Sequence, residues 1–185
     1  MIDLALVWVG IIGLGVLIYV VMDGFDLGIG ILFPFMNGTQ ERDVMMNTVA
    51  PVWDGNETWM VLGGAGLFAA FPLVYSTVLS ALYLPIIFMV VALIFRGVAF
   101  EFRFKATRTK YLWDLAFIWG SILSSFFQGV ILGAYIQGIQ TTNGIYSGGG
   151  WDWFTPFTCF TGLGVVVMYA TLGCGWLIWK TEKEI

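Results

Sequence analysis

The sequence predicts an all-α membrane protein, a polytopic transmembrane helical bundle of five helices with its N-terminus outside. Its composition is the first reason: 59% of the 185 residues are hydrophobic, 11% are charged, and the mean hydropathy is +0.88. Soluble domains have about 45–50% apolar and about 25% charged residues. The second reason is five apolar segments, each near the length of about 20 residues that spans a bilayer. The third is the distribution of Lys and Arg, which fall in alternate connections.

The five segments follow one another with short connections. They cover Leu4–Phe35, about 57–71, about 74–100, about 115–139 and about 154–179. Pro72 separates the second segment from the third, which predicts a tight turn there. No polar domain or linker interrupts the series, so we expect residues 1–185 to form a single membrane-embedded domain, a four-helix bundle with a fifth helix beside it.

The positive residues predict the orientation. Residues 96–110 hold five of the eight Lys and Arg, Arg42 follows the first segment, and Lys180 and Lys183 follow the fifth. The connections at 71–76 and 140–155 contain none. The positive-inside rule then places the connections after the first, third and fifth spans in the cytoplasm. The first residues also lack the positive region of a cleavable signal peptide, so we expect the first segment to stay as an anchor.

Charge and residue usage exclude several functions. A net charge of −4 leaves no basic face for nucleic acid. Histidine is absent, which excludes His-ligated haem, His-bound zinc and a Ser-His nucleophile within this chain. A site made of carboxylates alone is a weak candidate for transition metals, which also favour imidazole or thiolate. We therefore expect this chain to carry no catalytic residue, metal or cofactor of its own.

Two aspartates interrupt the first apolar segment. In "VVMDGFDLGIG" (20–30), Asp23 and Asp26 are three residues apart and lie on one face if the helix continues through them. A charge at the bilayer centre costs about 2.5–3.5 kcal/mol even on the translocon scale, so such residues usually face protein and serve a function. The alternative is an interfacial turn, because Asp-Gly is a turn signal. If the helix continues, both acids should accept hydrogen bonds from neighbouring helices.

A second polar stretch, "APVWDGNETW" (50–59), begins the second segment. Asp54 and Glu57 repeat the spacing of three, and Asn56 and Trp53 lie beside them. Capping of the helix start by Asp54 or Asn56, with Glu57 at the positive end of the helix dipole, explains one acid fully and the other in part. The alternative is a functional group of acids at the mouth of the bundle.

A third stretch, "LIFRGVAFEFRFK" (93–105), places Arg96 at the end of a long apolar run. Arg96 either extends to the membrane surface or pairs with a carboxylate of the first or second helix at the same depth. All three stretches lie toward the predicted cytoplasmic side. Acids grouped with Asn, Arg and Gln indicate a hydrated path for protons or ions.

These motifs resemble a known family. "DGFDLGIG", then "APVWDGNETW", "LFAAFP" and "FRGVAFEFR", in this order, are similar to subunit II of cytochrome bd-type quinol oxidase, with the cyanide-insensitive branch as the nearest group. The resemblance implies a bacterial inner-membrane heterodimer that oxidises quinol and reduces O₂ to water. It also implies that subunit I holds all the haems, two of b type and one of d type, and that subunit II supports assembly and delivers protons from the cytoplasm.

The resemblance assigns roles to the polar residues. The family's proposed uptake of protons in subunit II involves the aspartate of WDGN, here Asp54, and we expect Asp54, Glu57 and Arg96 to form this pathway. We further expect Asp54 to lie within salt-bridge or one-water distance of Arg96. The roles expected of the other polar residues are helix docking and structural support: Asp23, Asp26, Asn56 and Trp53. The partners that the resemblance implies are subunit I, an optional small subunit, and membrane lipid and quinone.

Family chains are about twice this length, so this sequence corresponds to an N-terminal half, as a fragment or as one piece of a split subunit. Two other readings stay open from the residues. One is a structural scaffold whose polar residues make only interhelical hydrogen bonds. The other is an independent ion or proton-coupled transporter, which would be expected to show an inverted repeat that this sequence lacks.

Overall fold

The computed structural model describes residues 3–36 and 38–181, so Lys183 lies outside the described residues. Nearly all of this chain is helical. Its elements, in chain order, are α1 (Leu4–Leu32), the short 3₁₀ helix η1 (Phe33–Phe35), α2 (Thr39–Val49), α3 (Trp53–Ala70), α4 (Pro72–Phe102), α5 (Lys110–Gln137), β1 (Thr141–Thr142), β2 (Ile145–Tyr146) and α6 (Pro156–Lys180). The prediction of an all-α bundle is therefore confirmed.

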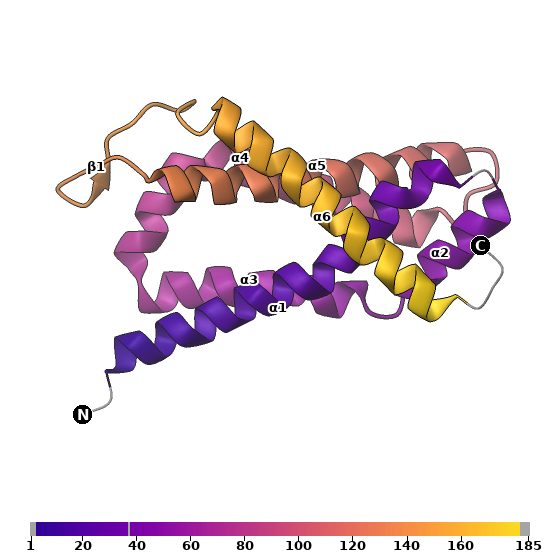
Figure 1. Ribbon diagram of the computed structural model, residues 1–185, viewed down its shortest axis with the longest axis horizontal. Helices are drawn as coiled ribbons and strands as arrows, with labels where there is room; N and C mark the ends of the chain where they lie inside the picture. Colours follow the sequence, from indigo (N-terminus) through magenta and orange to yellow (C-terminus); the bar gives the residue numbers. More distant parts are fainter. Residues whose placement is uncertain (1–2, 37, 182–185) are drawn as a thin grey trace.

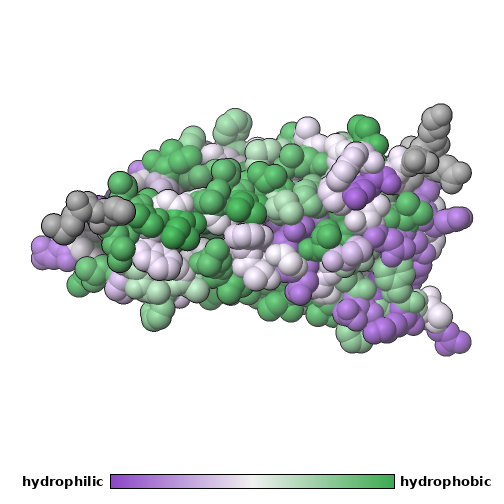
Figure 2. All heavy atoms as spheres, turned by 90° about the horizontal axis from the view of Figure 1, so that it is seen from below, coloured by the Kyte–Doolittle hydropathy of each residue, from purple (hydrophilic) through white to green (hydrophobic). Residues whose placement is uncertain are grey.

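The long helices run between two chemically different ends of an elongated molecule (Figure 1). One end carries η1, α2, the start of α3, the turn from α4 to α5 and the end of α6. The opposite end carries the N-terminus, the turn between α3 and α4 and the β1–β2 hairpin. Figure 2 shows hydrophobic residues along the length of the molecule and hydrophilic residues gathered at the first of these ends. We call it the basic end, because Arg42, Arg103 and Lys110 lie there.

The prediction of five membrane spans is wrong in number. Within the described residues, four helices are long and apolar enough to cross a membrane: Leu4–Phe35, Pro72–Phe102, Lys110–Gln137 and Pro156–Lys180. Helix α3 forms where the second span was expected, but it has only 18 residues. Its first two turns contain Asp54, Asn56 and Glu57, which lower its hydropathy below that of a span.

Two elements were not predicted. The polar helix α2 lies at the basic end, where the sequence analysis saw only a connection. The pair β1 and β2 forms an antiparallel hairpin in the 140–155 connection. Asn143 and Gly144, at its tip, both have positive φ angles of 53° and 78°, the arrangement that makes Asn-Gly the strongest short hairpin signal. The tight turn expected at Pro72 is confirmed, since Phe71 alone separates α3 from α4.

Close approach of backbones brings α1 and α6 together. A Cβ atom on Gly28 would collide with the carbonyl oxygen of Tyr169 and lie 2.8 Å from the backbone nitrogen of Gly173. Phe25 stacks on Trp176 from the same pair of helices, with ring centroids 4.1 Å apart. Small residues at such a crossing allow close van der Waals packing, which drives helix association in membranes.

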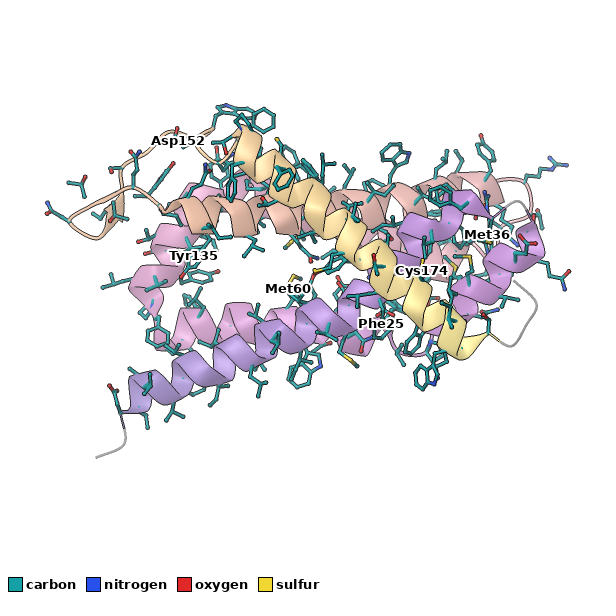
Figure 3. All side chains as sticks on the ribbon, viewed as in Figure 1. Phe25, Met36, Met60, Tyr135, Asp152 and Cys174 are labelled. Atoms are coloured by element: carbon teal, nitrogen blue, oxygen red, sulfur yellow. The ribbon has the colours of Figure 1, made fainter. Side chains whose placement is uncertain are left out.

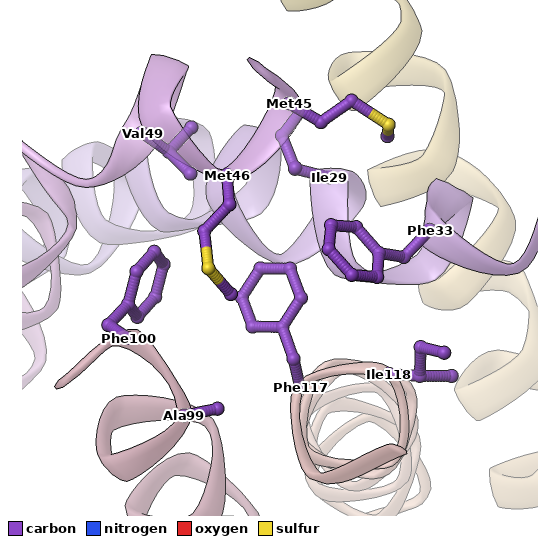
Figure 4. Packing of buried hydrophobic residues seen from close by; sticks show 9 residues of the cluster. All are labelled: Ile29, Phe33, Met45, Met46, Val49, Ala99, Phe100, Phe117 and Ile118. Atoms are coloured by element: carbon purple, nitrogen blue, oxygen red, sulfur yellow. The ribbon is translucent and has the colours of Figure 1, made fainter. Parts of the chain in front are cut away.

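The largest apolar cluster packs η1 and α2 against α1, α4 and α5 near the basic end (Figure 4). Its fully buried members include Phe33, Met46 and Phe117, and the rings of Phe33 and Phe117 meet edge to face at 4.9 Å. This cluster fixes α2 beneath the ends of α4 and α5. It leaves the polar start of α3 beside the middle of α1, where the candidate site lies.

Candidate functional site

Asp23 and Asp26 lie inside the protein, on a helix that continues through both residues. Both are fully buried within α1, which excludes the alternative of a turn. Each accepts a hydrogen bond from a different helix: Asp23 from Arg96 of α4, and Asp26 from Asn56 of α3. The two carboxyl groups therefore join α1 to both neighbours in the way the spacing indicated.

Arg96 is the centre of this site. Its side chain is completely buried, which excludes the alternative that it extends to the membrane surface. One terminal nitrogen, Nη1, lies 3.3 Å from Oδ1 of Asp23 and 3.6 Å from Oε2 of Glu57. The guanidinium lies 5.5 Å from the centre of the Phe100 ring and 5.9 Å from that of Trp53, within the range of cation–π attraction.

The first two turns of α3 connect this buried group to the surface. Asn56 is buried and donates to Oδ2 of Asp26 at 2.8 Å. The side chain of Glu57 is 21% exposed, while Asp54, one turn earlier, is fully on the surface. Asp54, Glu57 and Thr58 line an open groove of about 420 Å³ between α3 and α4. Asp54 at the surface and Glu57 beside Arg96 are thus the acidic side chains of a groove whose other walls are mostly apolar.

Of the two distances expected between Asp54 and Arg96, the salt bridge does not form in the described residues, and the distance bridged by one water stays a prediction. Among the described residues, the ion pairs of Arg96 are with Asp23 and Glu57. Helical geometry explains the difference. Asp54 and Glu57 both line the groove, but Glu57 lies one turn farther along α3 and is the acid close enough to pair with Arg96. Asp54 is left in the first turn of α3, at the outer mouth of the groove.

Trp53 supports the same group from the side. It is half-buried, and its ring stacks on that of Phe100 with centroids 4.8 Å apart and an angle of 4° between the ring planes. A Cβ atom on Gly97 would lie 3.4 Å from the Trp53 ring, so the small residue after Arg96 makes room for the stack. Trp53 thereby docks the start of α3 on α4, consistent with the structural role expected of it.

Several polar atoms in this region lack hydrogen-bond partners. Of the six such buried side-chain atoms in the described part of the chain, five belong to this site: Asp23 Oδ2, Asp26 Oδ1, Arg96 Nε, Arg96 Nη2 and Ser121 Oγ. An unsatisfied buried polar group costs about 1–3 kcal/mol. Such a concentration is typical of a site that exchanges protons or binds water rather than of a finished structural core.

A second set of buried polar groups continues from the site along α5; of its members only Gln128 belonged to the Gln residues grouped with the predicted hydrated path, and the others were not predicted. Nε2 of Gln128 donates to the Tyr19 hydroxyl at 2.6 Å, and the Tyr169 hydroxyl donates to Oε1 of Gln128 at 2.7 Å. Ser121 and Ser125, on the same face of α5, are fully buried. The spacing Ser121, Ser125, Gln128 on a long apolar helix is the signal that could have predicted this polar stripe.

A separate ion network closes the basic end; its Arg and Lys residues entered the predictions only as positive charges of the connections, and its aspartates were not predicted. Arg103 is fully buried and bridges Asp43 of α2 and Asp114 of α5. Arg42 also pairs with Asp114, at 3.0 Å, and Lys110 pairs with Asp43, also at 3.0 Å. Burial alone would raise the pKa of Asp43, but hydrogen bonds from Arg103 and Lys110 outweigh it and hold the pKa below its ordinary value.

Neither end of the molecule adds a metal site to this cluster within the described residues. Asp152, on the loop after β2, and Met36, after η1, lie at opposite ends of the molecule (Figure 3). Within residues 3–36 and 38–181, no group of three His, Cys, Asp or Glu side chains is placed to hold a metal ion. The candidate site is an acid–arginine cluster made of Asp23, Asp26, Glu57 and Arg96.

Comparison with known proteins places the whole chain in one group. The sequence profile described as "Cytochrome bd terminal oxidase subunit II" matches residues 4–185. "Cytochrome bd-I ubiquinol oxidase subunit 2" of Escherichia coli K12 is 34% identical over 190 residues, covering 98% of this chain and 50% of that protein. "Cytochrome bd ubiquinol oxidase subunit 2" of Bacillus subtilis 168 is 40% identical over 121 residues, covering 64% of this chain and 36% of that protein.

"Probable cytochrome oxidase subunit 2" of Haemophilus influenzae is 33% identical over 173 residues, covering 89% of this chain and 46% of that protein. The chain thus spans about half or less of the length of these curated relatives. The match over residues 4–185 includes all the site residues named above. The chain belongs to the cytochrome bd terminal oxidase subunit II family.

Proposed function

We propose that this chain serves in a bacterial respiratory terminal oxidase that oxidises quinol and reduces O₂ to water, as a haem-free subunit that takes up protons from the cytoplasm. Family membership supports the oxidase assignment. The observation that supports the proton role is the placement of the partly exposed Glu57 between the surface groove that Asp54 lines and the buried Arg96, with which Glu57 pairs.

Each residue of the route has a distinct task. Asp54 attracts protons to the outer mouth of the groove, where water is in contact with its carboxylate. Glu57, between water and Arg96, accepts a proton and passes it inward. Arg96 orients the carboxylates of Glu57 and Asp23 through its two ion pairs.

The orientation is part of the proposal. The basic end carries Arg42, Arg103, Lys110 and Lys180, and the positive-inside rule assigns such an end to the cytoplasm. The start of α3, which carries Asp54 of the groove, lies at this end (Figure 1). Protons would then enter from the cytoplasm of a bacterial inner-membrane complex, in which residues 1–185 form one membrane-embedded domain.

The haems are assigned to the partner, subunit I. The whole sequence contains no histidine, and the described residues hold no metal-binding group of three. This chain therefore does not fit a b- or d-type haem. Quinol is the substrate of the complex, and the partner is expected to bind it.

The competing proposal is a scaffold whose polar cluster only docks helices. Oxidase turnover of the assembled complex separates the two. Asp54→Asn and Glu57→Gln keep the shape of each side chain and remove its charge, and both should slow turnover most at alkaline pH, where protons are scarce. Glu101→Gln is the matched control, because Glu101 is an exposed residue of α4 whose ion pair among the described residues is with Lys105. Wild-type rates at neutral and alkaline pH in both variants, with normal haem content, would contradict the proton role and favour the scaffold.

A further inference from the structure

A pocket separate from the acid–arginine cluster lies at the opposite end of the molecule from the basic end. Its volume is about 210 Å³, and its walls come from α4, the end of α5, the hairpin and the loop that carries Asp152 (Figure 3). Its lining includes Ala81, Leu82, Ala134, Tyr146, Asp152 and Trp153. The proposed uptake of protons makes no use of these residues.

One wall of the pocket carries a carboxylate. Asp152 is exposed, and its Oδ2 accepts a hydrogen bond from the backbone N–H of Gly149 at 2.7 Å. The Tyr146 hydroxyl lies 3.4 Å from the same oxygen and donates to the Gly149 carbonyl at 2.7 Å. Gly148 permits this arrangement, because a Cβ atom there would collide with both Oδ2 and the Tyr146 hydroxyl. Within the described residues both contacts of the carboxylate are to Oδ2, which leaves Oδ1 for a ligand.

The end of α5 adds to the negative character of the pocket. Gln137, the last residue of α5, belongs to the lining. The C-terminus of a helix carries about half an elementary negative charge on its free carbonyl groups and stabilises cations. Residues 71–76 and 140–155, which lie at this end, contain no Lys or Arg. The electrostatics of the pocket therefore favour a positively charged ligand.

The rest of the lining is apolar and aromatic, which favours an organic cation over a metal ion. The three aliphatic residues of the lining belong with Trp153 to one buried apolar cluster, and Tyr146 packs against it. The Trp153 indole N–H already donates to the carbonyl of Gly150 at 2.9 Å, so the ring offers a ligand apolar contact. Metal ions such as Ca²⁺ take six to eight oxygen ligands, and the described residues place no three acids together. Organic ammonium groups, in contrast, bind next to aromatic rings.

We propose that this pocket binds the ammonium group of a small organic amine, with the charge at Asp152 and the end of α5 and the carbon atoms against Trp153. The ammonium group has two sources, a free amine and the headgroup of phosphatidylethanolamine. Trp151 and Phe154, beside the pocket, are 67% and 59% exposed. Exposed aromatic side chains of this kind gather at the membrane–water interface, so a lipid headgroup is within reach of the site.

Nuclear magnetic resonance by saturation transfer, on the assembled complex in an uncharged detergent, tests the proposal. The probe is n-propylamine, which like the lysine side chain is protonated at neutral pH, and 1-propanol is its uncharged counterpart. The wild type should bind the amine in preference to the alcohol. Asp152→Asn keeps the shape of the side chain and an acceptor for Gly149, and it should weaken the affinity for the amine by about tenfold or more.

Asp3→Asn is the matched control, because Asp3 is an exposed acid at the same end that caps α1. It should bind the amine as the wild type does. Asp152→Glu separates charge from loop geometry: it disturbs the loop at least as much as Asp152→Asn but keeps the carboxylate, so it should bind the amine more tightly than Asp152→Asn does. Equal affinity of the wild type and Asp152→Asn, equal binding of amine and alcohol, or no recovery in Asp152→Glu would overturn the proposal.

Added lipid distinguishes the two sources of the ammonium group. If the lipid headgroup occupies the pocket, phosphatidylethanolamine should displace n-propylamine from the wild type, and phosphatidylglycerol, which has no ammonium group, should not. If neither lipid displaces the probe, the pocket takes the free amine. Both outcomes support an ammonium site, whereas equal displacement by the two lipids would show that the probe is held without recognition of its charge and would contradict it.

Discussion

Replacing Arg96 with Met should destabilise the assembled protein more than any other single removal of a positive charge. The guanidinium is completely buried and lies within 3.6 Å of both Asp23 and Glu57. Removing one partner of a buried ion pair typically costs about 3–5 kcal/mol, because the other charge is left without compensation. We expect about 3 kcal/mol here, since Glu57 is partly exposed and regains water while Asp23 does not.

That cost corresponds to roughly a hundredfold change in the folded-to-unfolded ratio. The assay is the denaturation midpoint of the detergent-solubilised complex, together with the amount of this chain that co-purifies with its partner. Arg108→Met, at an exposed arginine of the basic end, is the matched control and should change neither. The double variant Arg96→Met with Asp23→Asn should recover at least about 1 kcal/mol, because it removes the stranded charge. Wild-type stability in the single variant, or no recovery in the double variant, would refute the reasoning.

Three further predictions follow from other parts of the molecule. Acidification should destabilise the basic end. The pKa of Asp43 in the folded protein is below its ordinary value of 3.8. The stability that Asp43 contributes is therefore complete above pH 3.8 and is lost as the pH falls through the folded pKa. Denaturation midpoints measured down to that range should depend less on pH in Asp43→Asn, and equal dependence would contradict the prediction. Gly28→Leu should prevent α1 from docking on α6, whereas Gly175→Leu, where a Cβ meets nothing within 4 Å, should assemble normally; equal co-purification of the two would count against the crossing. This chain purified alone should show no Soret absorption band, because the sequence has no histidine to ligate haem; stoichiometric haem would overturn its assignment to the partner.

Long apolar runs predicted most of the fold because they have few alternatives in a membrane. Their helices formed within a few residues of the expected bounds. The exception, α3, was counted as a span because its last part is apolar, but its polar first turns serve the site instead. Helix α2 was missed for a related reason: its 11 residues are mostly polar, and they are held as a helix by Met45 and Met46 in the core and by Asp43 in the ion network.

The candidate site was predictable in membership but not in pairing. Charged residues within apolar runs are conspicuous, so Asp23, Asp26 and Arg96 could be named from the sequence alone. Which carboxylate reaches Arg96 depends on helix rotation, and a difference of one turn gave the contact to Glu57 rather than Asp54. Neutral polar residues such as those on α5 give a weaker signal, because serine and tyrosine are common in membrane helices.

The rate of proton uptake tests the central claim most directly. The fully reduced complex, in lightly buffered solution with a pH indicator dye, is mixed rapidly with O₂, and proton uptake and haem oxidation are followed together. The account predicts that Asp54→Asn and Glu57→Gln slow proton uptake while the binding of O₂ and the haem content match those of the wild type and of Glu101→Gln. Proton uptake at the wild-type rate in both variants would show that protons reach the oxygen chemistry by another route, and would contradict the account.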